Sequence, residues 1–297
     1  MSRHSSRKSL RTRIGLATGS VAAAAALVGG VLAVNQDATP TAEAAPGPMV
    51  VFGDSFVSAP DQYVTYGLAD DPNYPSTDGC VQDYSNWPRR VADQTGREVH
   101  DWSCNGMTSG EMLGKIDRAR DAGALNAGTG VVALSVGLND WGPYGFTKDG
   151  NNFLDPGVVH GAYVDHLRQA AEKIRAVAPN AQIIMPGMLS VTDPNSLFCP
   201  LNVIPEFPLG VPVPVLHDVE NWNRDAQQDA ANQIGATFID VKGASWDRST
   251  CSTPDSERMV AGWIDTTTPD WKMVNHPSAK GNQFVADLVK AQILAQI

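Results

Sequence analysis

Five short apolar runs, separated by segments with helical periodicity, constrain the fold of this 297-residue chain more than any other feature. The runs are Met49–Phe52, Val99–Trp102, Gly130–Val136, Ala181–Met185 and Thr237–Val241, and the helical segments are Tyr84–Thr95, Gly110–Ala122, Val158–Val177, Leu216–Ile234 and Ser278 to the C-terminus. Short hydrophobic runs joined by helices are typical of a parallel sheet covered on both faces. The pattern therefore predicts an α/β fold with a five-stranded parallel sheet and no second folded domain.

The first 44 residues have the layout of a secretory signal peptide. Five basic residues between Arg3 and Arg13 precede an apolar stretch from Ile14 to Val34, and Ala42-Glu43-Ala44 offers a cleavage site. The apolar stretch comes close to the length that spans a bilayer, so a membrane anchor is the alternative. We favour cleavage near Ala44. Residues 45–297 would then be a secreted, monomeric domain without stable membrane insertion.

Charge and cysteine content indicate where the protein works and which partners it lacks. The net charge of −10 argues against nucleic acid, which requires a basic surface. Four cysteines in an exported chain imply two disulfides, with three possible pairings. Cysteines that follow neighbouring strands lie on the same edge of the sheet, so we favour Cys80–Cys104 and Cys199–Cys251. The close cysteine and histidine spacing of zinc sites is missing, and no metal is expected.

A serine and a histidine stand where hydrolytic chemistry could occur. Ser55 lies in Gly53-Asp54-Ser55, directly after the first predicted strand, and Gly53 is expected to permit a sharp turn. A serine hydroxyl becomes a good nucleophile only when a base takes its proton. His276 is the candidate base, because Pro277 holds it in a loop before the last helix. In open α/β folds such loops meet at the carboxyl edge of the sheet.

Two further loops could supply hydrogen-bond donors for a developing oxyanion. Gly106 follows the second predicted strand and can present a bare backbone N–H, while the side chain of Asn139 follows the third. Each residue alone could equally be an ordinary turn residue. All of these positions together, each next to its own strand or helix, favour acyl transfer chemistry.

These segments resemble the four blocks of the SGNH (GDSL-type) hydrolases. The blocks are Gly53-Asp54-Ser55, Gly106, Gly137-Leu138-Asn139-Asp140 and His276-Pro277, and residues 103–108 are similar to the second block of secreted actinobacterial esterases and phospholipases. The resemblance implies a flavodoxin-like, three-layer α/β/α sandwich without a cofactor. It also implies that Ser55 is the nucleophile and His276 the base. The oxyanion hole would consist of the Ser55 and Gly106 amides and the Asn139 side chain, while Asp54 and Asp140 would brace their loops.

One position departs from the family pattern. The third member of the catalytic triad is commonly an aspartate three residues before the histidine, and here that residue is Met273. The Met273 carbonyl could orient His276, Asp270 could reach back to it, or an acid from elsewhere could serve. We favour the Met273 carbonyl, which would leave a catalytic dyad.

The resulting functional hypothesis is a secreted serine esterase or lipase that acts on acyl or lipid esters through an acyl-enzyme on Ser55. A carbohydrate deacetylase or a cell-envelope acyltransferase could use the same residues. A non-catalytic protein that binds surfaces through its tryptophans is a third alternative. The proline-rich segment Leu189–Val215 carries apolar residues that either line an acyl pocket or pack against the body as cover. They are Leu197, Phe198, Ile204, Phe207, Leu209, Val211 and Val213.

Overall fold

The computed structural model describes residues 47–295, which belong to one compact unit, residues 44–297. The predicted signal peptide lies outside the described residues. Within residues 47–295, every helix is too short or too polar to cross a membrane.

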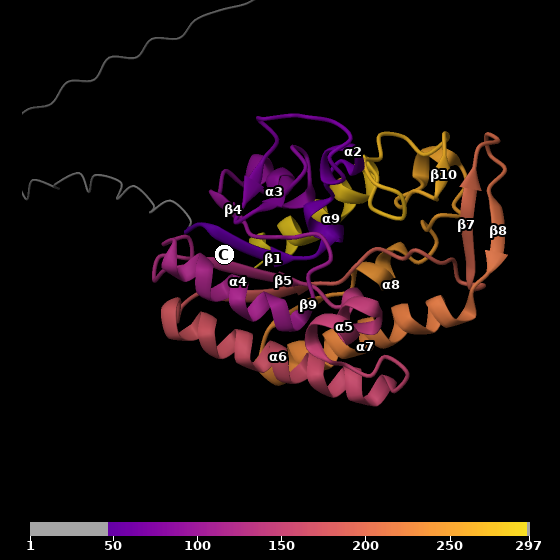
Figure 1. Cartoon of the computed structure of the whole chain (residues 1–297). Helices are drawn as coiled ribbons and strands as arrows, with labels where there is room; N and C mark the ends of the chain where they lie inside the picture. Colours follow the sequence, from indigo (N-terminus) through magenta and orange to yellow (C-terminus); the bar gives the residue numbers. More distant parts are fainter. Residues whose placement is uncertain (1–46, 296–297) are drawn as a thin grey trace, which may run out of the picture. The chain divides into compact units, whose positions relative to one another are not determined.

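The predicted five-stranded parallel sheet is confirmed. Its strands are β1 (Met49–Gly53), β4 (Val99–Asp101), β5 (Val131–Ser135), β6 (Gln182–Pro186) and β9 (Thr237–Ile239), in the spatial order β4-β1-β5-β6-β9 (Figure 1). This is the strand order of flavodoxin-like folds. The direction of winding reverses between β1 and β5. Ligands of open α/β sheets bind in the crevice at such a reversal, beyond the carboxyl ends of the strands.

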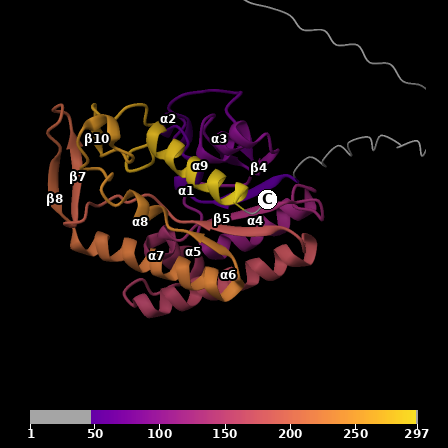
Figure 2. The ribbon, with the colours of Figure 1, turned by 180° about the vertical axis from the view of Figure 1, so that it is seen from behind.

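Helices cover both faces of the sheet, which confirms the α/β/α sandwich. Along β1, Val50 and Phe52 face one apolar cluster while Met49 and Val51 face the other, as a strand buried on both sides requires. One layer contains α4 (Ser109–Asp121), α6 (Pro156–Val177) and α7 (Pro214–Ile234). The other contains α3 (Trp87–Thr95) and α9 (Ala279–Leu294) (Figures 1 and 2).

Short elements fill the connections. They are α1 (Ser55–Ser58), α2 (Gln62–Thr65), β2 (Ser76–Thr77), β3 (Cys80–Val81), α5 (Pro143–Asp149), α8 (Val241–Ser245) and 3₁₀ turns at Leu138–Trp141 and Asp255–Glu257. The helix starts carry their own signals. For example, Thr108 and Glu111 form a capping box on α4, in which the backbone N–H of each residue donates to the side chain of the other.

A second, smaller sheet differs from expectation. The proline-rich segment Leu189–Val215, where no strand was predicted, contains the antiparallel pair β7 (Leu197–Asn202) and β8 (Leu209–Pro212). Strand β7 also pairs in parallel with β10 (Ile264–Asp265). Six prolines in the segment hide the strand pattern, because proline is normally confined to strand ends and edges.

The structure contains both predicted disulfides. Cys80–Cys104 ties β3 to the turn after β4, and Cys199–Cys251 ties β7 to the segment that follows α8. Loops of 24 and 52 residues are closed in this way, which stabilises the fold by about 3–4 kcal/mol per bridge in the chain-entropy model.

Candidate active site

Ser55 is the first residue of α1, a single helical turn that follows the end of β1. The Asp54 side chain caps this turn by accepting a hydrogen bond from the Phe56 N–H at 2.9 Å. A Cβ atom on Gly53 would lie 2.1 Å from a methyl carbon of Val57. Gly53 also lies outside the positive-φ region, so our expected reason for this glycine was wrong. Space for Val57, rather than an unusual backbone, requires it.

The His276 ring is oriented by a main-chain carbonyl. Its Nδ1 lies 2.7 Å from the carbonyl oxygen of Val274. A carbonyl can only accept, so Nδ1 carries the proton and Nε2 keeps its lone pair. The ring also packs against Phe56, with 5.1 Å between the ring centroids.

Our preference for the Met273 carbonyl was therefore wrong by one residue. Asn275 adopts a left-handed conformation with a φ of 61°, which turns the Val274 carbonyl toward the ring. The Met273 carbonyl instead accepts the backbone N–H of His276 at 3.3 Å. Asp270 is exposed and makes no hydrogen bond with the ring in the part of the chain that the structure describes.

The protonation state of His276 suits a general base. Burial lowers the pKa of its imidazole below the usual value of 6.5, and the bond to Val274 only partly opposes this effect. The ring is therefore neutral at pH 7. Its Nε2 atom is buried and has no hydrogen-bond partner among residues 47–295.

Ser55 and His276 line one cavity of about 230 Å³. Apolar side chains form much of its wall: Phe56, Leu138, Val191 and Leu216. Asp54, Ser55, Asn139, Asn275 and His276 supply the polar part. No hydrogen bond joins Ser55 to His276 within the described residues, a state common in enzymes without bound substrate.

Asn139 lines this cavity, whereas Gly106 does not. The Asn139 side chain donates one amide hydrogen to the Met107 carbonyl at 3.1 Å, and the other has no acceptor among residues 47–295. Gly106 lies in the turn after β4 with a φ of 70°, a conformation that favours glycine. That turn is tied to the end of β1 by the hydrogen bond from the Cys104 N–H to the Gly53 carbonyl, at 2.8 Å.

Two buried carboxyl groups flank the site. Burial raises the pKa of Asp54 to about 7 and that of Asp140 to about 7. Asp140 accepts hydrogen bonds from the backbone and side chain of Ser109 at the start of α4. Asp54 and Asp140 therefore hold the start of α1 and the start of α4 in place, which agrees with the bracing role that the family resemblance implies.

A second serine–histidine pair lies outside the cavity. Ser109 Oγ contacts Asp140 and lies 2.8 Å from Nδ1 of His166. Ser109 is fully buried, so an ester carbonyl cannot reach it. Asp140, Asp149 and His166 are also close enough to hold a metal ion, although Asp140 and His166 already bond to Ser109.

Comparison with known proteins identifies the family. Residues 51–284 match the GDSL-like lipase/acylhydrolase family. The chain belongs to this family of ester hydrolases. It is 26% identical to Lipase 2 of Streptomyces coelicolor over 300 residues, which cover 91% of this chain and 94% of that protein.

Two of the solved structures with a similar fold come from Streptomyces, as the Lipase 2 relative does. An extracellular lipase from Streptomyces rimosus has a TM-score of 0.51 at 20% identity, over 83% of this chain and 99% of that one. Phospholipase A1 from Streptomyces albidoflavus NA297 has a TM-score of 0.50 at 18% identity, over 84% of this chain and 99% of that one. At this identity the two structures support the fold alone.

Sequence reasoning missed several parts of the site. The Val274 carbonyl carried no signal, because any residue supplies one. The contact between Phe56 and His276 joins positions far apart in the sequence. Val191 lies near the start of the proline-rich segment and Leu216 directly after it. None of the seven apolar residues that could have lined a pocket lines the cavity, and Phe198 instead packs in a core cluster.

Proposed function

We propose that this family member is a secreted serine hydrolase of acyl or lipid esters, with Ser55 as nucleophile and His276 as base. One observation carries the proposal. The buried, unpartnered Nε2 of a neutral histidine and a strand-end serine line the same cavity, whose walls are largely apolar.

The reaction would proceed in two halves. Nε2 of His276 takes the hydroxyl proton as Ser55 Oγ attacks the ester carbonyl, and the tetrahedral intermediate then collapses as the same nitrogen returns the proton to the leaving alcohol. The acyl-enzyme is hydrolysed by the reverse sequence, with water in place of the alcohol. Val274 keeps the proton on Nδ1 throughout, so Nε2 always faces the reaction. A neutral carbonyl stabilises the imidazolium less than a carboxylate would.

Three donors are available for the oxyanion. The backbone N–H groups of Ser55 and Gly106 donate no hydrogen bond to any residue that the structure describes, and Asn139 has a free amide hydrogen. Fixed donors of this kind stabilise the charge that develops on the carbonyl oxygen, by about 3–4 kcal/mol each in a well-studied protease. Gly106 would complete the set from the neighbouring loop.

The cavity walls favour an acyl chain over a sugar. Phe56, Leu138, Val191 and Leu216 offer no hydrogen bonds from their side chains to hydroxyl groups, as a carbohydrate deacetylase would need. The name of the Streptomyces coelicolor relative, Lipase 2, points the same way. Acyl transfer to another alcohol remains the alternative outcome of the same acyl-enzyme.

Secretion is supported by the cysteines. Both pairs are oxidised in the structure, and stable disulfides are typical of exported proteins. The predicted signal peptide, with cleavage near Ala44, provides the route.

The test is hydrolysis of p-nitrophenyl esters from acetyl to palmitoyl by the purified protein and by its Ser55→Ala variant. We expect a maximum at medium or long chains and loss of activity in the variant. Ser109→Ala is the matched control and should keep its activity. Full activity in Ser55→Ala would refute the proposal, and activity confined to acetyl would indicate a deacetylase.

A further inference from the structure

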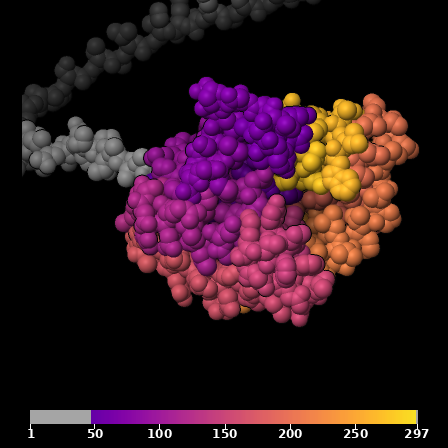
Figure 3. Space-filling model, viewed as in Figure 1, coloured from indigo at the N-terminus to yellow at the C-terminus, as the bar shows by residue number. Residues whose placement is uncertain are grey.

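The outer surface of the small sheet carries large apolar side chains that face solvent. We call Val203, Ile204, Phe207, Val211, Trp263 and Ile264 the apolar platform, because they lie on the β7–β8 hairpin and on the adjoining start of β10. Phe207 is 59% exposed and Trp263 58%. Figure 3 shows the two segments, orange and yellow, side by side at one edge of the molecule. Large apolar side chains exposed together on neighbouring elements are typical of a binding site.

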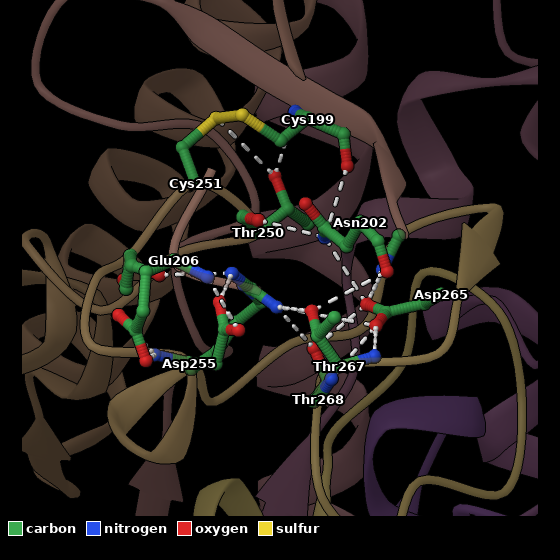
Figure 4. A network of polar contacts seen from close by, with 12 residues as sticks. Cys199, Asn202, Glu206, Thr250, Cys251, Asp255, Asp265, Thr267 and Thr268 are labelled. Atoms are coloured by element: carbon green, nitrogen blue, oxygen red, sulfur yellow. Dashed lines mark hydrogen bonds and ion pairs between the residues drawn. A yellow bond between two sulfur atoms is a disulfide. The ribbon is translucent and has the colours of Figure 1, made fainter. Parts of the chain in front are cut away.

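Polar contacts fix the platform from beneath (Figure 4). Asn202 donates to the Asp265 carboxylate at 3.1 Å, and the Glu206 N–H donates to Asp255 at 2.9 Å. The Cys199–Cys251 disulfide holds the same strand to the body. The apolar side chains are therefore exposed on a hairpin that is anchored to the body of the protein. Their exposure does not result from loose packing of a loop.

The chain connects the platform to the catalytic cavity at both ends of the hairpin. Val191 and Leu216, which line the cavity, precede β7 and follow β8. The segment that leads to Trp263 is also held to the loop of the catalytic histidine, because the Ala261 N–H donates to the His276 carbonyl at 3.1 Å.

The scarcity of charged residues and the prolines next to β8 indicate which kind of partner binds the platform. Residues 197–212 contain no lysine, arginine or aspartate, and their single charged side chain, Glu206, accepts from the Asp255 N–H. An uncharged surface matches an uncharged partner, and a chain of net charge −10 is repelled by an anionic one. Pro208 and Pro212 flank or end the edge strand β8, and prolines there oppose pairing with a strand of another protein.

We propose that the apolar platform docks the protein on an uncharged or zwitterionic lipid surface, which holds the enzyme at the source of its ester substrate. This inference rests on the proposed ester hydrolase function. Its physical basis is burial of the platform side chains among the acyl chains at the lipid boundary.

The test measures co-sedimentation with phosphatidylcholine vesicles in the Ser55→Ala background, where binding is separate from turnover. The double substitution Ile204→Ser and Phe207→Ser should raise the Kd at least about tenfold, because two large side chains no longer enter the lipid. Leu294→Ser is the matched control. Leu294 is 51% exposed at the end of α9, on the opposite side of the molecule from the hairpin (Figures 1 and 2).

Three results would overturn the inference. They are equal vesicle binding by the double variant, an equal loss in Leu294→Ser, and a dimer in sedimentation velocity without vesicles that the double substitution abolishes. With Ser55 intact, the double variant should hydrolyse dissolved p-nitrophenyl acetate at the parent rate and lose activity only on dispersed lipid. If the parent hydrolyses no ester while vesicle binding still depends on the platform, the proposed function fails and the docking surface stands.

Discussion

Carboxyl groups are buried in two regions of the molecule, at the cavity edge of the large sheet and in the polar network beneath the β7–β8 hairpin. We call this network, formed by Asn202, Asp255, Arg258 and Asp265, the hairpin base. The two regions shift the pKa of a buried carboxyl group in opposite directions. Asp54, at the cavity, has one backbone hydrogen bond from Phe56, and burial raises its pKa to about 7. Burial also acts to raise the pKa of Asp265, at the hairpin base. There, hydrogen bonds from Gly262, Thr268 and Asn202 outweigh it and hold the pKa below the ordinary value.

The difference distinguishes a reactive site at the cavity from a structural network at the hairpin base. At the cavity, polar atoms such as Nε2 of His276 are left without partners, which costs stability but leaves them open to substrate. At the hairpin base, Arg258 is fully buried and lies 2.5 Å from Asp255, with further bonds to Thr267 and Thr268 (Figure 4). These contacts fix the platform and leave the chemistry to the sheet.

The largest effect is expected on the cavity side. His276→Ala should lower kcat/KM on a soluble ester by about 10⁴-fold or more, because it removes the nitrogen that is proposed to take the Ser55 proton. His166→Gln is the matched control and should stay within about threefold of the parent. Activity that survives in His276→Ala but is lost in His166→Gln would mean that the buried Ser109–His166 pair, and not the cavity, carries the activity.

On the hairpin side, the corresponding change should affect stability. Arg258→Met leaves the carboxylates of Asp255 and Asp265 without their cation, which should lower the free energy of unfolding by about 3–5 kcal/mol. Urea denaturation measures the change. Lys280→Met removes an exposed ion pair with Glu257 and should cost less than about 1 kcal/mol. Equal losses in the two variants would contradict the structural role of the buried network.

Close packing behind Ser55 gives the next prediction. Gly53→Ala places a Cβ 2.1 Å from the Val57 side chain and should destabilise the protein by about 1–3 kcal/mol. Adding Val57→Ala should restore part of that loss by making room. Thermal unfolding of the single and double variants tests this, and no rescue would show that the backbone, rather than the space, requires glycine.

The raised pKa of Asp54 predicts a pH-dependent effect on stability. The folded pKa of about 7 exceeds the unfolded value of 3.8, so the stabilising contribution of the protonated form is complete below pH 3.8. It is lost as the pH rises through about 7. Asp54→Asn keeps a capping side chain and lacks this titration. Relative to the parent, it should gain about 3–4 kcal/mol between pH 4 and pH 8, because each pKa unit corresponds to about 1.4 kcal/mol. A constant difference across that range would contradict the raised pKa.

The smallest effect concerns His276 itself. Nε2 must be neutral to accept the Ser55 proton, so kcat/KM should fall as the pH drops through the pKa of the ring. Burial lowers that pKa, and the midpoint should therefore lie below 6.5. The profile is best measured in Asp54→Asn, where the neighbouring carboxyl no longer titrates. A midpoint above 6.5 would show that the ring is stabilised in its charged form.

The two regions also differ in how far the sequence reveals them. The strands of the large sheet are continuous apolar runs, because both faces are buried, and their positions and parallel arrangement could be predicted. The loops that follow them converge by topology, so Ser55, Asn139 and His276 could be placed together before the structure was known.

The hairpin base and the orientation of His276 could not be predicted. The apolar residues of the proline-rich segment were expected to line a pocket or pack as cover, yet Ile204, Phe207 and Val211 face solvent. The hairpin that carries them pairs through β7 with β10, a strand about sixty residues further along the chain, and local sequence does not reveal that pairing. The choice of Val274 over Met273 depends on the backbone angle of Asn275, which local sequence does not determine.

The most direct test of the central claim is labelling with a fluorophosphonate, which forms a bond only with an activated serine. Peptide mapping by mass spectrometry should find one adduct, on Ser55, which persists in Ser109→Ala and disappears in His276→Ala. An adduct on Ser109 or elsewhere, or undiminished labelling of Ser55 without His276, would contradict the account.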